Sequence, residues 1–242
     1  MEGLRISVVA PVFNEEDVIR GVIEKWAEIL RSTSFDPEII LTDDGSCDRT
    51  PEILNALQDR IDFLKVIRHE RNGGYGRALQ SAIKNSTGDY IVTIDSDGQF
   101  DLSEFKILYK KLETENLDCV TGYRKNKSDS LIRVVADRIL NLVVRVLFGL
   151  NFRDTNCALK ICKGNLIRAV SIEAMGYPAP TELLIRLSKS GAKIGEMGIN
   201  HFQRSGGSSK LKVFGVGYYM LLFLIFLRFK IFLFDRKVIQ VL

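Results

Sequence analysis

The sequence is poor in residues that build metal and disulfide frameworks. It has four cysteines and two histidines in 242 residues, with no Cys-x-x-Cys pair and no ligand-like spacing between the cysteines and His69 or His201. These absences argue against a cysteine–histidine metal site and favour reduced, buried thiols in a cytosolic compartment. The first residues lack a basic segment followed by a long apolar run, so we expect no signal peptide.

The chain also has little net charge, no evident internal repeat and neither a Gly-x-Gly-x-x-Gly nor a Walker loop. Its 34 Lys and Arg against 30 Asp and Glu leave +4, but residues 204–242 carry seven basic residues and one acid. A basic tail of this kind favours an anionic membrane surface. We expect no nucleic-acid partner, because the basic residues are separated by apolar ones.

Periodicity indicates one large α/β domain. The sequence is 46% apolar, which is enough for a sizeable core. Expected strands are 5–12, 37–44, 62–69, 89–95 and 118–123. Expected helices are 14–32, 50–58, 75–85, 103–115 and 131–148. Asn14 is the expected N-cap of the first helix. This alternation predicts a mostly parallel sheet flanked by helices.

Two carboxylates, Asp95 and Asp97, follow the apolar run YIVTI. An unpaired buried carboxylate is costly, so both need water, donors or a cation. In extended chain, positions i and i+2 face the same side, and two such carboxylates can share one Mg²⁺ or Mn²⁺, with Gln99 nearby. For this motif alone, a plain turn of Asp, Ser and Gly is the favoured alternative.

Two further motifs follow other expected strands. Asp43 and Asp44 end the strand 37–44, where carboxylates can accept hydrogen bonds from a base or ribose, and Gly45 permits a tight turn. The stretch RNGGYGRA (71–78) places paired glycines before a helix. Backbone N–H groups there can face an anion, although a glycine turn would be the default for this stretch alone.

Together these motifs resemble the family 2 glycosyltransferases, and most of all the branch that moves sugars onto polyprenyl phosphates, such as dolichyl-phosphate mannose synthase. The matching stretches are PVFNEE (11–16), DDGSCDRT (43–50), RNGGYGRA (71–78), TGDYIVTIDSDGQ (87–99), GYR (122–124), FRDTNCALKI (152–161), TELLIRLSKSGAKIGEMGI (181–199) and RSGGSSK (204–210). The chain departs from the family at Tyr75, where Lys is frequent, and at Cys157-Ala158, where Gly-Phe is frequent.

The resemblance implies a GT-A, Rossmann-like domain over residues 1–210, with a nucleotide-binding half (1–123) and an acceptor half (124–210). The implied nucleotide-site residues are Pro11, Asn14, Glu15, Asp43, Asp44, Gly45, Arg71, Gly74, Asp95 and Ser96. The implied ligands of Mg²⁺ or Mn²⁺ on the donor diphosphate are Asp95, Asp97 and Gln99. The implied activity is inverting transfer of a hexose from a UDP- or GDP-sugar to a polyprenyl phosphate.

The acceptor decides which other residues take part in the reaction. A lipid phosphate is already anionic and needs cationic ligands; the candidates are Arg124, Arg133, Arg204 and Lys210. A hydroxyl of a glycan needs a general base instead, for which Glu182 is the candidate. The slightly favoured interpretation of Glu182 is an ordinary acid in the first turn of a helix capped by Thr181. A third hypothesis is a non-catalytic, nucleotide-sugar-binding membrane subunit, against which the intact acidic motifs argue.

Two segments predict a membrane partner. Residues 131–148 form an amphipathic helix that suits either a protein surface or a membrane interface. Residues 213–227 form an uncharged run. This run is shorter than the ~20 residues needed to span a bilayer. Basic residues flank this run, so we expect residues 211–242 to form a membrane-associated helix with the enzyme on the cytoplasmic side. Whether the helix crosses the bilayer or lies on it stays open.

Overall fold

The computed structural model describes residues 3–125, 131–203 and 213–237, with the backbone alone for 131–133 and 213–216. The strands are β1 (Arg5–Val12), β2 (Asp36–Asp43), β3 (Leu64–Arg68), β4 (Tyr90–Thr93), β5 (Cys119–Arg124), β6 (Lys160–Lys163) and β7 (Ile194–Ile199). The helices are α1 (Ile19–Arg31), α2 (Thr50–Gln58), α3 (Tyr75–Asn85), the 3₁₀ turn η1 (Leu102–Glu104), α4 (Phe105–Thr114), α5 (Leu131–Phe148), α6 (Gly164–Ala169), α7 (Ala179–Lys189) and α8 (Val213–Asp235).

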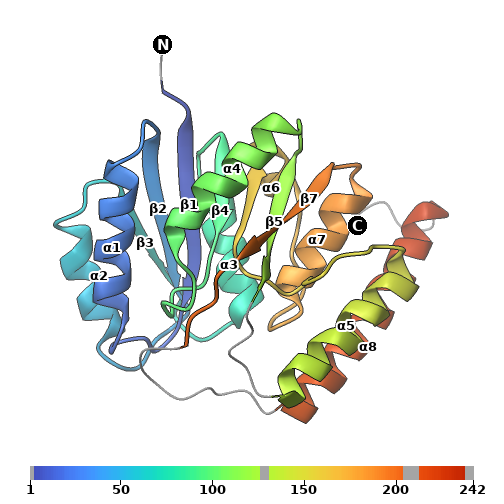
Figure 1. Cartoon of the computed structure of the whole chain (residues 1–242). Helices are drawn as coiled ribbons and strands as arrows, with labels where there is room; N and C mark the ends of the chain where they lie inside the picture. Colours follow the sequence, from blue (N-terminus) through green and yellow to red (C-terminus); the bar gives the residue numbers. More distant parts are fainter. Residues whose placement is uncertain (1–2, 126–130, 204–212, 238–242) are drawn as a thin grey trace.

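The strands form one seven-stranded sheet in the order β3-β2-β1-β4-β6-β5-β7 (Figure 1). β6 pairs antiparallel with β4 and β5, whereas the other pairings are parallel. The carboxyl ends of β3, β2, β1 and β4 therefore meet at one edge of the sheet. The expected α/β class with a mostly parallel sheet is confirmed.

Helices cover both faces of the sheet. On one face, α1, α2 and α4 bury apolar residues such as Ile23, Leu54 and Phe105 against it. On the other, α3, α6 and α7 contribute a second core. The strands that are buried on both faces read as nearly continuous apolar runs, as parallel strands do in α/β proteins.

The first helix begins later than its sequence pattern predicts. α1 starts at Ile19, and its N-cap is Val18, which makes no side-chain cap. The prediction that Asn14 caps this helix is wrong: Asn14 has a φ of 53°, and its side chain accepts a hydrogen bond from the N–H of Cys47 (2.9 Å). Asn14 thus ties the end of β1 to the loop after β2. Its left-handed backbone conformation is one that Asn adopts more readily than most residues.

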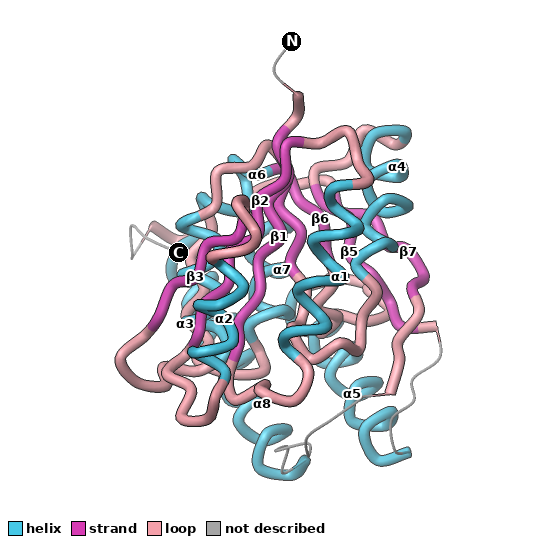
Figure 2. The backbone as a smooth tube through the Cα atoms, turned by 90° about the vertical axis from the view of Figure 1, so that its left-hand side faces the viewer, coloured by secondary structure: helices cyan, strands magenta, loops and turns pink. Residues whose placement is uncertain are grey.

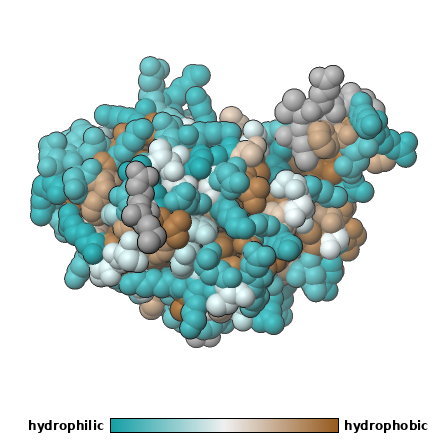
Figure 3. Space-filling model, turned by 90° about the horizontal axis from the view of Figure 1, so that it is seen from above, coloured by the Kyte–Doolittle hydropathy of each residue, from teal (hydrophilic) through white to brown (hydrophobic). Residues whose placement is uncertain are grey.

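α5 and α8 lie side by side, apart from the sheet and near the edge where the parallel strands end (Figure 1 and Figure 2). They share a third apolar cluster, in which Val144 and Leu224 pack with Ile185 of α7. Within the described residues, Gly217–Asp235 is the stretch that is long and apolar enough to cross a membrane, and only 22% of it is buried. The face of the molecule seen in Figure 3, viewed from above, is by contrast mostly hydrophilic.

Candidate functional site

The acidic pair lies just beyond β4. Tyr75 donates a hydrogen bond from its hydroxyl to Asp95 Oδ1 (2.8 Å), and Asp97 Oδ1 accepts one from the N–H of Gln99 (3.0 Å). The buried hydroxyl of Ser96 donates to the carbonyl of Pro11 (2.8 Å). The loop after β4 is thereby fastened to the end of β1, with both carboxylates at the shared strand edge.

The electrostatics of this pair suit a cation. Burial and the charge of Asp97 raise the pKa of the Asp95 carboxyl to about 7. Burial and Asp95 also raise the pKa of Tyr75 well above its usual value, so its hydroxyl remains a donor. A raised pKa means that the surrounding protein leaves the negative charge under-compensated. A divalent ion would supply that missing positive charge, so the residues fit the metal that the sequence predicts.

The protein alone offers few ligands to such an ion. In the described part of the chain, no group of three His, Cys, Asp or Glu side chains is placed to hold a metal. The amide nitrogen of Gln99 donates to the carbonyl of Phe202 (3.1 Å), which anchors this side chain to the segment after β7. Asp95 and Asp97 would therefore need oxygen atoms from a bound phosphate, as is usual for Mg²⁺. The metal role of all three residues stays a prediction.

The two carboxylates after β2 have different surroundings. Asp44 accepts hydrogen bonds from the N–H groups of Gly73 (2.9 Å) and Gly74 (2.7 Å), and its Oδ1 lies 2.7 Å from His69 Nδ1. Asp44 thus holds the glycine loop, which we define as residues 71–76. Asp43 is also buried. Its Oδ1 accepts a hydrogen bond from the N–H of Ser46 (3.0 Å), whereas its Oδ2 has no hydrogen bond among the described residues and lies 3.5 Å from Arg68 Nε, with which it forms an ion pair. Of the two, Asp43 keeps a buried acceptor that a nucleotide could use.

The glycine loop is packed closely against the segment between α6 and α7. Gly76 donates its N–H to the carbonyl of Met175 (3.1 Å). Gly74 has a φ of 92°, and a Cβ on it would lie 2.1 Å from that same carbonyl. The last two residues of the loop are the first two of α3, so the loop stands at a helix N-terminus, where anions are favoured. Arg71 and Arg77 are exposed beside it.

The remaining predicted nucleotide residues link neighbouring loops. Glu15 donates its N–H to Thr50 Oγ1 (2.9 Å). Gly45 has a φ of 73°, and a Cβ there would lie 2.7 Å from the backbone of Arg71. Pro11 is the partner of Ser96 described above. These contacts bring every predicted nucleotide residue to the same strand edge, while its contact with a nucleotide stays a prediction.

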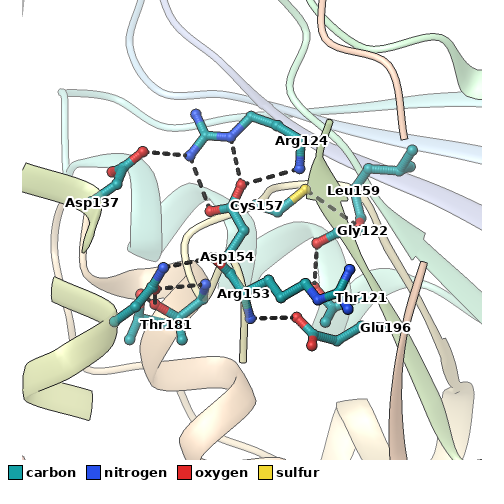
Figure 4. A network of polar contacts seen from close by, with 12 residues as sticks. Thr121, Gly122, Arg124, Asp137, Arg153, Asp154, Cys157, Leu159, Thr181 and Glu196 are labelled. Carbon is teal, nitrogen blue, oxygen red and sulfur yellow. Dashed lines mark hydrogen bonds and ion pairs between the residues drawn. The ribbon is translucent and has the colours of Figure 1, made fainter. Parts of the chain in front are cut away.

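Arg124 lies in a compact ion cluster at the end of β5 (Figure 4). Its guanidinium binds Asp154 through two hydrogen bonds (2.7 and 3.0 Å) and Asp137 of α5 through a third (3.0 Å). Burial opposes its charge, but the two carboxylates outweigh this and raise the pKa of Arg124. Its predicted role toward phosphate is untested. Arg204, Lys210 and the side chain of Arg133 lie outside the described part of the chain.

Glu182 is fully buried in α7. Its carboxylate accepts hydrogen bonds from the N–H groups of Glu173 (3.0 and 3.1 Å) and Ala174 (2.8 Å) and from Arg186 Nε (2.7 Å). Burial raises its pKa despite these donors. The N-cap of α7 is Pro178, so the expected cap at Thr181 is wrong. These contacts favour Glu182 as a residue that holds the segment before α7.

Sequence reasoning missed the contacts of two polar residues of the site, Lys160 and Tyr75. Lys160 of β6 is fully buried, and its ammonium donates to the carbonyl of Cys157; its charge also opposes the rise in the pKa of Asp95. A lysine inside the apolar run ALKIC is the pattern that could have revealed it. Tyr75 was noted as a departure from the family, but nothing local to it predicts a contact with Asp95, twenty residues further on.

Comparison with known proteins gives concordant results. Residues 7–175 match the family model described as Glycosyl transferase family 2. The chain is 30% identical over 235 residues to dodecaprenyl-phosphate galacturonate synthase of Rhizobium johnstonii, covering 95% of this chain and 69% of that protein. It is also 30% identical over 206 residues to undecaprenyl-phosphate 4-deoxy-4-formamido-L-arabinose transferase of Pectobacterium carotovorum, covering 85% of this chain and 62% of the relative.

A solved structure of similar fold is glucosyl-3-phosphoglycerate synthase from Mycobacterium tuberculosis in complex with Mn²⁺, UDP and glucosyl-3-phosphoglycerate. Its TM-score is 0.69 at 24% identity, over 93% of this chain and 80% of that one. The sheet, its two helical layers and this similarity define a protein of the GT-A fold. The chain belongs to glycosyl transferase family 2, as both the family model and the curated relatives show.

Proposed function

We propose that this chain is a metal-dependent hexosyltransferase that moves a sugar from a nucleotide-diphospho-sugar to a polyprenyl phosphate at the cytoplasmic side of a membrane. The observation that carries the proposal is the placement of the two carboxylates Asp95 and Asp97 at one strand edge with the glycine loop and Asp43, where the charge of Asp97 and burial raise the pKa of Asp95. The printed names of relatives that act on dodecaprenyl and undecaprenyl phosphate support the acceptor class. The chain spans only part of these relatives, 69% and 62% of their lengths.

The donor half of the reaction rests on the strand edge. Asp95 and Asp97 would hold Mg²⁺ or Mn²⁺, which would supply positive charge beside the diphosphate of the donor. The glycine loop lies at the positive end of the α3 dipole, with the exposed Arg71 and Arg77 beside it to bind the diphosphate, while the N–H groups of its glycines are already bound by Asp44 and by the Met175 carbonyl. Asp43 keeps a buried acceptor for a ring or ribose donor of the nucleotide. Tyr75 fixes the orientation of Asp95 through its hydrogen bond.

The acceptor half needs no strong base if the nucleophile is a phosphate, because that group is anionic at pH 7. Its oxygen attacks the anomeric carbon while the nucleotide diphosphate leaves, which inverts the configuration. The surroundings of Glu182 agree with a phosphate acceptor rather than a hydroxyl acceptor. A general base must reach the proton that it removes, whereas the carboxylate of Glu182 is buried and occupied by Glu173, Ala174 and Arg186.

The paired helices α5 and α8 supply the membrane side. Exposed apolar residues of α8 include Leu222, Phe226 and Phe229, and those of α5 include Ile139 and Leu142. Apolar area of this kind, with basic residues nearby, is typical of a helix that sits in a membrane interface. Because both helices lie near the strand edge that bears the acidic pair, a lipid-linked acceptor would reach the site without leaving the bilayer.

The decisive experiment is transfer of radiolabelled sugars from a panel of UDP- and GDP-linked donors to polyprenyl phosphate, with Mg²⁺ or Mn²⁺. We expect a lipid-linked product with at least one donor and none in the presence of EDTA. Transfer to glycan hydroxyls alone would favour the alternative acceptor class. Binding of a nucleotide sugar without transfer to either acceptor would favour a non-catalytic subunit.

A further inference from the structure

An ion cluster of Lys230, Glu173 and Arg186 connects the apolar helix α8 to the segment before α7. None of these three residues is a predicted ligand of the metal or of the phosphate. Lys230 of α8 donates to the carboxylate of Glu173, which precedes α7. The same Glu173 oxygen lies 3.0 Å from Arg186 Nη2. Lys230 and Glu173 are only partly exposed, at 21% and 34% of their side chains. An ion pair shielded in this way is stronger than one in open solvent.

Glu173 is part of the segment on which the glycine loop rests. Glu182 fixes the N–H groups of Glu173 and Ala174, and Gln80 of α3 accepts a hydrogen bond from the N–H of Ile172. Both the charge and the backbone of Glu173 are therefore held in place. Any displacement of Glu173 moves the carbonyls of residues 174 and 175 with it, since they follow directly in the chain.

Those two carbonyls contact the glycine loop. The Met175 carbonyl accepts the N–H of Gly76 at 3.1 Å, and a Cβ on Gly76 would lie 1.7 Å from the Ala174 carbonyl. The residue between Gly74 and Gly76 is Tyr75, whose hydroxyl binds Asp95. Backbone packing this close leaves no space for the two segments to shift independently.

We propose that Lys230 and Glu173 are positioning residues that couple α8 to the glycine loop, so that seating of the apolar helix sets the shape of the donor site. The inference rests on the proposed function for the identity of the donor. The contacts run from Lys230 to Glu173, then through the Met175 carbonyl to Gly76, and from Tyr75 to Asp95. Neither positioning residue is among the predicted ligands of the metal, the nucleotide or the acceptor phosphate.

The chain offers a matched control on the same helix. Arg228 lies two residues from Lys230 and makes no ion pair with any other described residue. Lys230→Met and Arg228→Met each remove one positive charge from α8, so their general effect on membrane affinity is similar. Lys230→Arg keeps the charge that faces Glu173 and serves as the conservative variant.

The test uses the full chain in detergent micelles. Amide hydrogen exchange is followed on peptides that cover the glycine loop, and affinity is measured by calorimetry with Mn²⁺ and UDP or GDP. We expect Lys230→Met to speed exchange of the glycine loop and to weaken nucleotide binding by roughly threefold to tenfold. The donor KM should rise by a similar factor with a smaller change in kcat, whereas Arg228→Met and Lys230→Arg should resemble the wild type.

A second variant separates coupling from a local effect. Glu173→Gln removes the charge that pairs with Lys230. In the double variant that carries Glu173→Gln and Lys230→Met, the glycine loop should therefore exchange its amide hydrogens no faster than in Glu173→Gln alone. Additive effects, or equal effects of Lys230→Met and Arg228→Met, would overturn the proposal. So would wild-type exchange of the glycine loop in Lys230→Met. If the wild type binds neither nucleotide, the proposed function fails, but the exchange data still decide the coupling.

Discussion

Gly76→Ala gives the sharpest test of how the donor loop is held. An added Cβ would lie 1.7 Å from the Ala174 carbonyl, and contacts under 3.0 Å require a shift. The two backbone segments must therefore separate by about 1.3 Å or more. Such overpacking costs roughly 1–3 kcal/mol, and loss of the hydrogen bond from Gly76 to Met175 costs about 1 kcal/mol more. The gain in helix propensity offsets at most ~1 kcal/mol.

The net expectation is a loss of about 1–3 kcal/mol in the free energy of unfolding. Urea denaturation followed by fluorescence measures it conveniently, because the chain has one tryptophan and Trp26 is buried in α1. Gly21→Ala is the matched control. A Cβ on Gly21 meets nothing within 4 Å, so this change inside α1 should stabilise the protein by about 0.5–1 kcal/mol.

The same chemical change should thus have opposite signs at the two positions. Gly76→Ala should also weaken binding of Mn²⁺ and nucleotide, since the displaced loop carries Tyr75 away from Asp95. If Gly76→Ala is as stable as the wild type and binds nucleotide normally, the close approach of the loop to residues 174 and 175 is refuted, and with it the reasoning about how the loop is held.

The remaining predictions concern the acidic pair, the buried acid and the apolar helix. Asp97→Ala should abolish sugar transfer and weaken Mn²⁺ binding by roughly tenfold or more, with the melting temperature changed by only ~2 °C; near-normal turnover would remove the metal role. Glu182→Gln should destabilise the protein by about 1–3 kcal/mol and lower kcat only severalfold; a loss of several orders of magnitude without destabilisation would instead support the general-base role. Phe226→Glu should reduce co-sedimentation with anionic vesicles, and unchanged sedimentation would contradict the membrane face.

Much of the sheet could be predicted from the sequence, because parallel strands buried on both sides leave an unambiguous apolar pattern. The helix 131–148 and the strand 5–12 have the predicted bounds. β6 and β7 lie in residues 124–210, for which no strands were predicted, and the four-residue β6 is too short to leave a periodic pattern. Asn14 was misread because its side chain binds Cys47 across loops, a contact that local sequence does not encode.

The candidate site was predicted as a set of strand ends, but the sequence could not say which polar groups are already occupied. Asp43 and Asp44 are neighbours with the same chemistry, yet Asp44 is occupied by the glycine loop and His69. Asp43 Oδ2 accepts no hydrogen bond from the described residues, and the Arg68 guanidinium that pairs with it is 3.5 Å away and exposed. The resemblance to family 2 glycosyltransferases implies that Asp43 and Asp44 both line the nucleotide site. A carboxylate whose oxygens already accept three donors gains little from a fourth, because a new bond must displace an existing one. The nucleotide contact should therefore depend more on Asp43, and the shape of the loop more on Asp44.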